Sequence, residues 1–246
     1  MAAEKLLIDK IEHRFSGKPF FEAREIAAFY RMKEKEISPA AINWRIHFLV
    51  RSGVFQRIGK GKYVLGKGRS YFPEISGTLK TLFLRVTEEF PYSDVCIWNT
   101  SSFNEFMLHQ PARFFTIIEI SKETSEAAFY FLKDLKKQVF LEPDEEILEK
   151  YLSGDREAFV VKPLVTEAPT QIIKGVTTVT LEKMLVDIFC GEDIFAVQQG
   201  TELKTIFREA LVKYTVNRSR MMRYADRRGK KEQLGRFLKS FSNLRQ

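Results

Sequence analysis

The hydrophobic positions between Ser38 and Gly53 repeat with helical spacing. Ser38 is a favourable N-cap, and Pro39 suits the first helical position, where no backbone N–H is needed. One apolar face then runs along the segment, formed by Ile42, Ile46, Leu49 and Val50. The pattern predicts a helix that Gly53 ends.

Two short β-prone runs follow this helix, Val54–Ile58 and Lys62–Leu65. They are joined through Gly59-Lys60-Gly61, so they predict a β-hairpin with a basic tip. Upstream, the pattern predicts a helix over Lys5–Phe15, a short strand at Phe20-Phe21 and a helix over Glu22–Arg31. Helix, short strand, helix, turn, helix and hairpin is the order of a winged helix-turn-helix, which we expect over residues 1–72.

Beyond the linker-like segment Lys67–Pro73, strand patterns alternate with helical ones, so residues 73–246 predict a second, α/β domain with a mixed sheet. The expected strands are Ser93–Asn99, Arg113–Ile120, Val139–Leu141, Ala158–Val165 and Gln171–Thr178. Helical patterns fill the C-terminal part, over Thr180–Phe189, Thr201–Asn217, Ser219–Ala225 and Lys231–Phe241. The expected fold class is therefore α+β, with an N-terminal winged helix-turn-helix and an α/β domain that ends in a basic helical layer.

The net charge of +8 is unevenly distributed along the chain. Residues 1–72 hold 15 Lys and Arg against 7 Asp and Glu, residues 73–200 hold 12 against 21, and residues 201–246 hold 13 against 4. Two basic ends flank an acidic middle. A polyanion such as DNA would therefore contact the ends.

Residues opposite or beside the apolar face of the Ser38–Gly53 helix are candidates for reading DNA. In the helix they are Ala40, Asn43, Trp44, Arg45, His47 and Arg51, and on the hairpin they are Arg57, Lys60 and Lys62. Two alternatives stay open at this stage. Trp44 and Phe48 either face DNA or pack against the second domain, and winged helices also serve as protein-interaction modules.

Seven basic residues crowd into positions 218–231, among them Arg218, Arg220, Arg223, Arg227 and Arg228. The planar fork of arginine suits phosphate or carboxylate. This second basic surface has three open partners: DNA, the acidic middle of the same chain, or another protein.

One catalytic pattern has to be weighed. Asp94 and Glu119 lie on neighbouring predicted strands, as in metal-dependent nucleases of the PD-(D/E)xK type. That pattern expects a lysine two residues after the second acid, but Ser121 stands there and Lys122 falls one place late. A degenerate nuclease domain is the alternative interpretation. The histidines and cysteines lack zinc-ligand spacing and no nucleotide-binding motif is present, so we expect a non-enzyme without metal or cofactor.

The two cysteines, Cys96 and Cys190, lie far apart in apolar runs, and no apolar run approaches the about 20 residues that span a bilayer. We therefore expect a cytoplasmic protein that does not cross a membrane.

Several short motifs together resemble the AbiEi-type antitoxins of bacterial type IV toxin–antitoxin systems. A T-x-E-K-x-L-x-D pattern comprises Thr180, Glu182, Lys183, Leu185 and Asp187. An R-x-A-L and a Tyr-Ala-x-Arg-x-Gly pattern follow, carried by Arg208, Ala210 and Leu211, then by Tyr224, Ala225, Arg227 and Gly229. The order of these motifs behind a winged helix carries the resemblance.

The resemblance implies a transcriptional autoregulator that binds inverted repeats of double-stranded DNA in its own promoter. It also implies that the C-terminal domain counteracts a nucleotidyltransferase-like toxin in abortive infection, and that the basic 218–231 helices serve this antitoxin role or bind DNA. The middle segment is larger than the resemblance leads one to expect.

Overall fold

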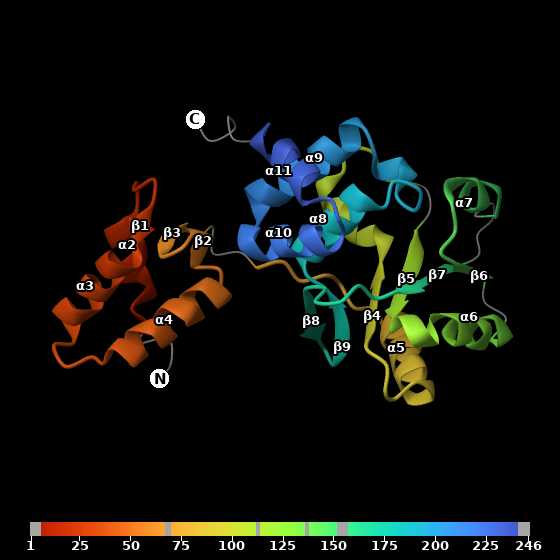
Figure 1. Cartoon of the computed structure of the whole chain (residues 1–246), viewed down its shortest axis with the longest axis horizontal. Helices are drawn as coiled ribbons and strands as arrows, with labels where there is room; N and C mark the ends of the chain where they lie inside the picture. Colours follow the sequence, from red (N-terminus) through yellow and green to blue (C-terminus); the bar gives the residue numbers. More distant parts are fainter. Residues whose placement is uncertain (1–5, 67–69, 112–113, 136–137, 152–156, 241–246) are drawn as a thin grey trace. The chain divides into compact units, whose positions relative to one another are not determined.

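The computed structural model describes residues 6–66, 70–111, 114–135, 138–151 and 157–240, and its fold is mixed α+β (Figure 1). The chain divides into two compact units. The first consists of Met1–Tyr71 and Leu211–Arg220, and the second of Phe72–Ala210 and Met221–Gln246. Three residues of the expected linker, 67–69, lie outside the described part.

Three helices and a small antiparallel sheet form the body of the first unit. The helices are α2 (Ile8–Phe15), α3 (Ala23–Lys33) and α4 (Pro39–Arg51), and the strands are β1 (Phe21–Glu22), β2 (Phe55–Gly59) and β3 (Lys62–Leu65). The strands pair in the order β1-β3-β2. Helices and strands therefore follow one another along the chain in the order that the hydrophobic pattern predicts.

Aromatic rings hold this unit together. Phe15 and Phe21 stack with their ring centroids 4.2 Å apart, and Phe55 meets Phe21 at 5.0 Å. All three side chains are almost completely buried, and Ile26 and Leu49 pack beside them. Each such ring removes about 150–250 Å² from water, so the small sheet and the three helices share one core.

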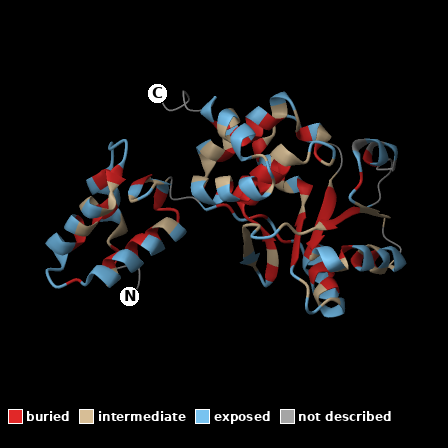
Figure 2. Cartoon of the chain, viewed as in Figure 1, coloured by how far each residue is buried: buried red, intermediate tan, exposed pale blue. Residues whose placement is uncertain are grey.

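The second unit is built on a four-stranded mixed sheet with the order β4-β5-β7-β6. Its strands are β4 (Val95–Asn99), β5 (Phe115–Ile120), β6 (Gln138–Leu141) and β7 (Ala158–Pro163). β4 runs antiparallel to β5, whereas β5 and β6 both run parallel to β7. β4, β5 and β7 are buried along nearly their whole length, whereas β6 is half-buried (Figure 2). Such burial requires cover on both faces.

Alternation along the strands sorts the residues onto these two faces. One face is apolar and packs against α5 (Gly77–Glu89) and α6 (Ser125–Asp134), through Val95, Ile97, Ile118, Ile120, Phe159 and Val161. The other face carries Trp98, Glu119 and Lys162 and meets α8 (Leu181–Cys190). The buried charged residues of the sheet, Glu119 and Lys162, thus lie on the face under α8.

The remaining helices follow along the chain. They are the 3-10 helices η1 (Thr100–Phe106), η2 (Lys122–Thr124) and η3 (Ala196–Gln198), and the helices α7 (Glu145–Tyr151), α9 (Thr201–Lys213), α10 (Arg218–Arg227) and α11 (Lys231–Lys239). Within the described part of the chain, no helix combines the length and the apolar character needed to cross a bilayer.

Two expected elements need correction. The expected strand Gln171–Thr178 is a hairpin of β8 (Thr170–Ile173) and β9 (Val176–Val179), which turns at Lys174 and Gly175 with positive φ angles of 51° and 82°. The helix expected over Thr201–Asn217 ends at Lys213.

Candidate functional site

Helix α4 begins and ends as its sequence dictates. The Ser38 hydroxyl accepts a hydrogen bond from the Ala41 N–H at 3.2 Å, and Pro39 occupies the first helical position. After Arg51 the chain reverses at Gly53, whose φ of 80° lies in the left-handed region that glycine enters without strain. The helix therefore has fixed ends.

The exposed side of α4 forms one continuous stripe. Six exposed residues spaced three and four apart make up this α4 stripe: Ala40, Asn43, Trp44, His47, Phe48 and Arg51. The Trp44 and Phe48 rings lie 5.7 Å apart and remain 54% and 37% exposed. The stripe therefore presents polar groups and aromatic rings side by side.

Arg45 is not part of this stripe, contrary to the expectation that it reads DNA. Its side chain lies on the buried side of α4, only 7% exposed. The guanidinium donates to the Glu34 carboxylate at 2.6 Å and lies over the Tyr30 ring, 4.8 Å from the centroid. Burial raises the pKa of Tyr30 to about 12, although Arg45 acts in the opposite direction. Arg45 therefore stabilises the first unit from within.

The hairpin between β2 and β3 presents three exposed cations. Arg57 donates to the Gly59 carbonyl at 3.1 Å, and the Lys62 ammonium lies over the Phe20 ring at 5.3 Å. Lys60, at the tip, has no partner among the residues that the structure describes. These local contacts orient Arg57 and Lys62, and all three cations remain exposed.

The arginines of α10 have different roles. Arg220 and Arg223 are exposed, and Arg218 is half-buried. Arg227 makes a two-point contact with the Glu167 carboxylate, at 2.5 and 3.3 Å, and Arg228 donates to Asp187 at 2.8 Å. Both acids belong to the acidic middle of the chain. For Arg227 and Arg228, the partner of the second basic surface is therefore the acidic middle of the same chain.

A buried ion cluster lies between the sheet and helices α8 and α10. Lys183 is at its centre, completely buried, with its ammonium 2.5 Å from Glu119 Oε2 and 2.5 Å from Asp187 Oδ2. Trp98 donates to Glu119 at 3.2 Å, and Tyr224 donates to Asp187 at 2.8 Å. Lys162 and Arg228 complete the buried ion cluster.

Electrostatics keep the cluster charged despite its burial. Burial alone would lower the pKa of Lys183, but Asp187 and Glu119 outweigh it and hold that pKa well above its usual range. Burial alone would raise the pKa of Asp187, but Lys183, Lys162 and Arg228 outweigh it and lower that pKa. Both groups are therefore ionised at neutral pH, and they join the sheet to α8 and α10.

Two of the three resemblance motifs contribute residues to this cluster. Lys183, Asp187 and Tyr224 all belong to it, whereas Thr180 caps α8 by accepting from the Lys183 N–H at 3.3 Å. Gly229, with a φ of 66°, follows the end of α10. In this structure these motif residues therefore hold the second unit together. Lys183 and Asp187, four residues apart in an apolar run, were the only sequence signal of the cluster.

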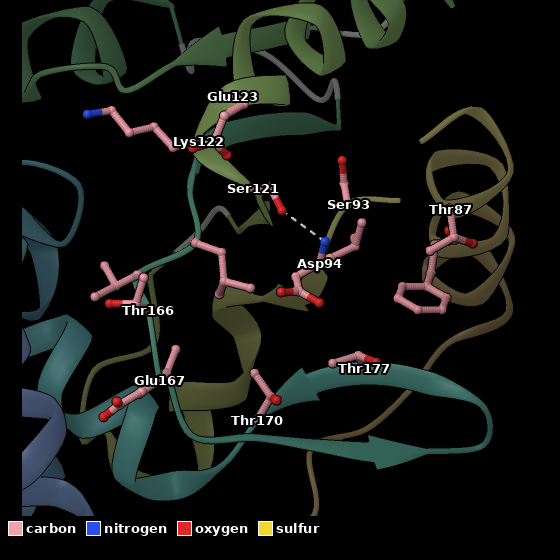
Figure 3. Close-up of a pocket in the computed structure, with 15 residues that line it drawn as sticks. Thr87, Ser93, Asp94, Ser121, Lys122, Glu123, Thr166, Glu167, Thr170 and Thr177 are labelled. Carbon is pink, nitrogen blue, oxygen red and sulfur yellow. Dashed lines mark hydrogen bonds between the residues drawn. The ribbon is translucent and has the colours of Figure 1, made fainter. Parts of the chain in front are cut away.

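A pocket of about 600 Å³ lies beside the other candidate acid, Asp94 (Figure 3). The Asp94 carboxylate points into it, with Thr170 and Thr177 on the opposite wall. Glu119 is not in this lining, because its carboxylate is buried and held by Lys183. The two acids therefore do not form a common carboxylate pair for a divalent cation, as the nuclease alternative requires. Across the described ranges, no three His, Cys, Asp or Glu side chains gather as metal ligands.

The chain matches a protein-family model over most of its length. A family of unknown function, DUF6577, matches residues 41–243, which is most of the chain and includes nearly all of α4. No curated protein matches.

Proposed function

Because the chain belongs to this family of unknown function, whose description carries no activity, we propose a function from the first unit itself: it is a winged helix-turn-helix that binds double-stranded DNA. The observation that carries the proposal is the α4 stripe, an exposed helix face on a unit that also carries exposed cations on the β2–β3 hairpin. The β1-β3-β2 sheet behind three helices supports the same interpretation.

In the proposed complex α4 lies in the major groove and the hairpin lies along the backbone. Asn43 and His47 offer hydrogen bonds to base edges, whereas Arg51, Arg57, Lys60 and Lys62 neutralise phosphates. The phosphate contacts position the protein without specifying a sequence. The contacts of the α4 stripe with base edges supply the specificity. Together with the resemblance, this supports a cytoplasmic transcriptional autoregulator that binds inverted repeats in its own promoter.

The resemblance extends the proposal to the second unit. We propose that this unit is the antitoxin part and counteracts a nucleotidyltransferase-like toxin, with Arg223 as its exposed candidate on α10. Arg220, also exposed on α10, belongs to the first unit. The test is growth of cells that carry a neighbouring nucleotidyltransferase-like gene, with and without this chain. Restored growth supports the antitoxin role, and unchanged growth arrest in the presence of the folded chain rejects it.

Binding to its own upstream DNA, measured against salt, tests the DNA-binding role. If Arg51, Arg57, Lys60 and Lys62 each contact one phosphate, the logarithm of the association constant should fall with the logarithm of the salt concentration with a slope of about −3.6. The affinity should then fall about 150-fold between 50 and 200 mM salt. Lys60→Ala should reduce the slope by about 0.9. Lys80→Ala, which removes an exposed lysine of α5, is the matched control and should leave the slope unchanged. Absence of a mobility shift at low salt would reject the proposal.

A further inference from the structure

The chemistry of the α4 stripe narrows the kind of DNA that this helix would read. Base-edge contacts in helix-turn-helix proteins come mainly from the N-terminal part of the recognition helix. Within α4, which the structure describes throughout, the exposed residues of the first three turns are Pro39, Ala40, Asn43, Trp44, His47 and Phe48. This set contains one pyrrolidine ring, one amide, one imidazole, one methyl group and two larger aromatic rings.

No lysine or arginine of α4 is exposed before Arg51. The guanidinium of Arg45 is turned inward, where Glu34 and the Tyr30 ring hold it. The commonest specific contact in the major groove is a bidentate arginine or lysine on guanine O6 and N7. Burial of Arg45 removes that contact from the part of the helix that reaches base edges.

What remains on the stripe suits adenine and thymine. The amide of Asn43 can both donate and accept, as adenine N7 and N6 require. The thymine C5-methyl is the only apolar group on a base edge in the major groove, and apolar side chains contact it. Trp44 keeps more than half of its surface exposed beside Asn43, and Ala40 lies one turn before it.

We infer that α4 reads A·T base pairs in the major groove, with Asn43 on adenine and with Trp44 and Ala40 against thymine methyl groups. This inference rests on the proposed DNA-binding function and deepens it. Trp44 and Asn43 are then the residues that determine specificity. His47, whose ring can donate to guanine N7 or to a phosphate, adds at most a single hydrogen bond and cannot make a two-point contact with guanine.

The experiment uses the full chain and duplexes selected from a random pool. The selected sites should share A·T pairs at their core. Replacing the thymine that Trp44 contacts by deoxyuracil removes only the methyl group, and the affinity should fall about fourfold. A buried methylene contributes about 0.8 kcal/mol, and 1.4 kcal/mol corresponds to a tenfold change in affinity, which gives this factor.

A variant links this effect to the helix. Trp44→Ala should weaken binding to the thymine duplex and abolish the difference between thymine and uracil, with an unchanged circular dichroism spectrum. Tyr92→Ala removes a fully exposed aromatic side chain in the second unit and should keep the difference. Asn43→Ala should relax the preference for adenine while the uracil effect persists.

Two failures are distinguishable. A folded protein that selects G·C-rich sites, or binds thymine and uracil duplexes equally, overturns the A·T inference and leaves DNA binding in place. A folded protein that retains no duplex from the pool at low salt overturns both the inference and the proposed function.

Discussion

Replacing Lys183 by methionine tests whether the buried ion cluster holds the second unit together. Methionine keeps the length and helix propensity of the lysine side chain but leaves Glu119 and Asp187 without the ammonium 2.5 Å from each. Removing one partner of a buried ion pair costs about 3–5 kcal/mol, because the other charge stays buried and uncompensated. Lys162 and Arg228 still neutralise part of the charge of the two acids. We therefore expect the free energy of unfolding to fall by about 4 kcal/mol and not by the upper limit of that range.

Thermal and urea unfolding at pH 7 measure this loss. A loss of 3–5 kcal/mol should lower Tm by about 6–20 °C for a protein of this size. Lys204→Met, which changes an exposed lysine of α9, is the matched control and should stay within about 0.5 kcal/mol of the wild type. Adding Glu119→Gln and Asp187→Asn to Lys183→Met should not recover the loss, because Lys162 and Arg228 would then lie without their acids. A Lys183→Met variant as stable as the wild type would refute the reasoning.

Three further predictions concern stability and reactivity. Arg45→Ala should destabilise the first unit by about 1–2 kcal/mol in urea unfolding, because it removes the contact with the Tyr30 ring. The sequence preference of the variant on DNA should be unchanged. A changed preference in a folded variant would contradict the buried position of Arg45. Because the folded-state pKa of Asp187 is depressed, its contribution to stability is present above its unfolded pKa of about 3.9 and is lost as pH falls through the folded value. The folded-state pKa of Lys183 is raised, so its contribution is present below about 10.4 and is lost as pH rises through the folded value; unfolding at a series of pH values checks both limits. Burial raises the pKa of Cys190 to about 11, so iodoacetamide should label it slowly at pH 8 in the native protein and quickly in urea, as mass spectrometry would show.

Local patterns predict much of the first unit. The helix after Ser38 begins at Pro39 and ends just before Gly53, and the strand Lys62–Leu65 has its expected bounds, because caps and glycines act on their own neighbourhood. The Gln171–Thr178 error has a local cause as well. β-Branched residues flank Lys174-Gly175 on both sides, and the two-residue turn signal is weak beside them.

The hydrophobic pattern does not predict which partners a charged side chain finds on other elements. Arg45 lies three residues after Ile42 and four before Leu49, which is core spacing, but only Glu34 and Tyr30 of the preceding segment make burial of its charge favourable. The acid that neutralises Lys183 from the sheet, Glu119, is 64 residues away along the chain. Sequence spacing gives no measure of such pairings.

The first unit is discontinuous in sequence, and this has a consequence for its synthesis. The Gln56 amide, on hairpin strand β2 and almost fully buried, donates to the Val216 carbonyl, and Thr215 donates to the Gly53 carbonyl at 3.3 Å. Until residues 211–220 leave the ribosome, the Gln56 amide lacks its acceptor. At about 5–20 residues per second, roughly 150 residues take on the order of 10–30 s to emerge. During that interval the nascent unit lacks part of its structure, so the proposed DNA-binding unit becomes complete only after residue 220 has emerged.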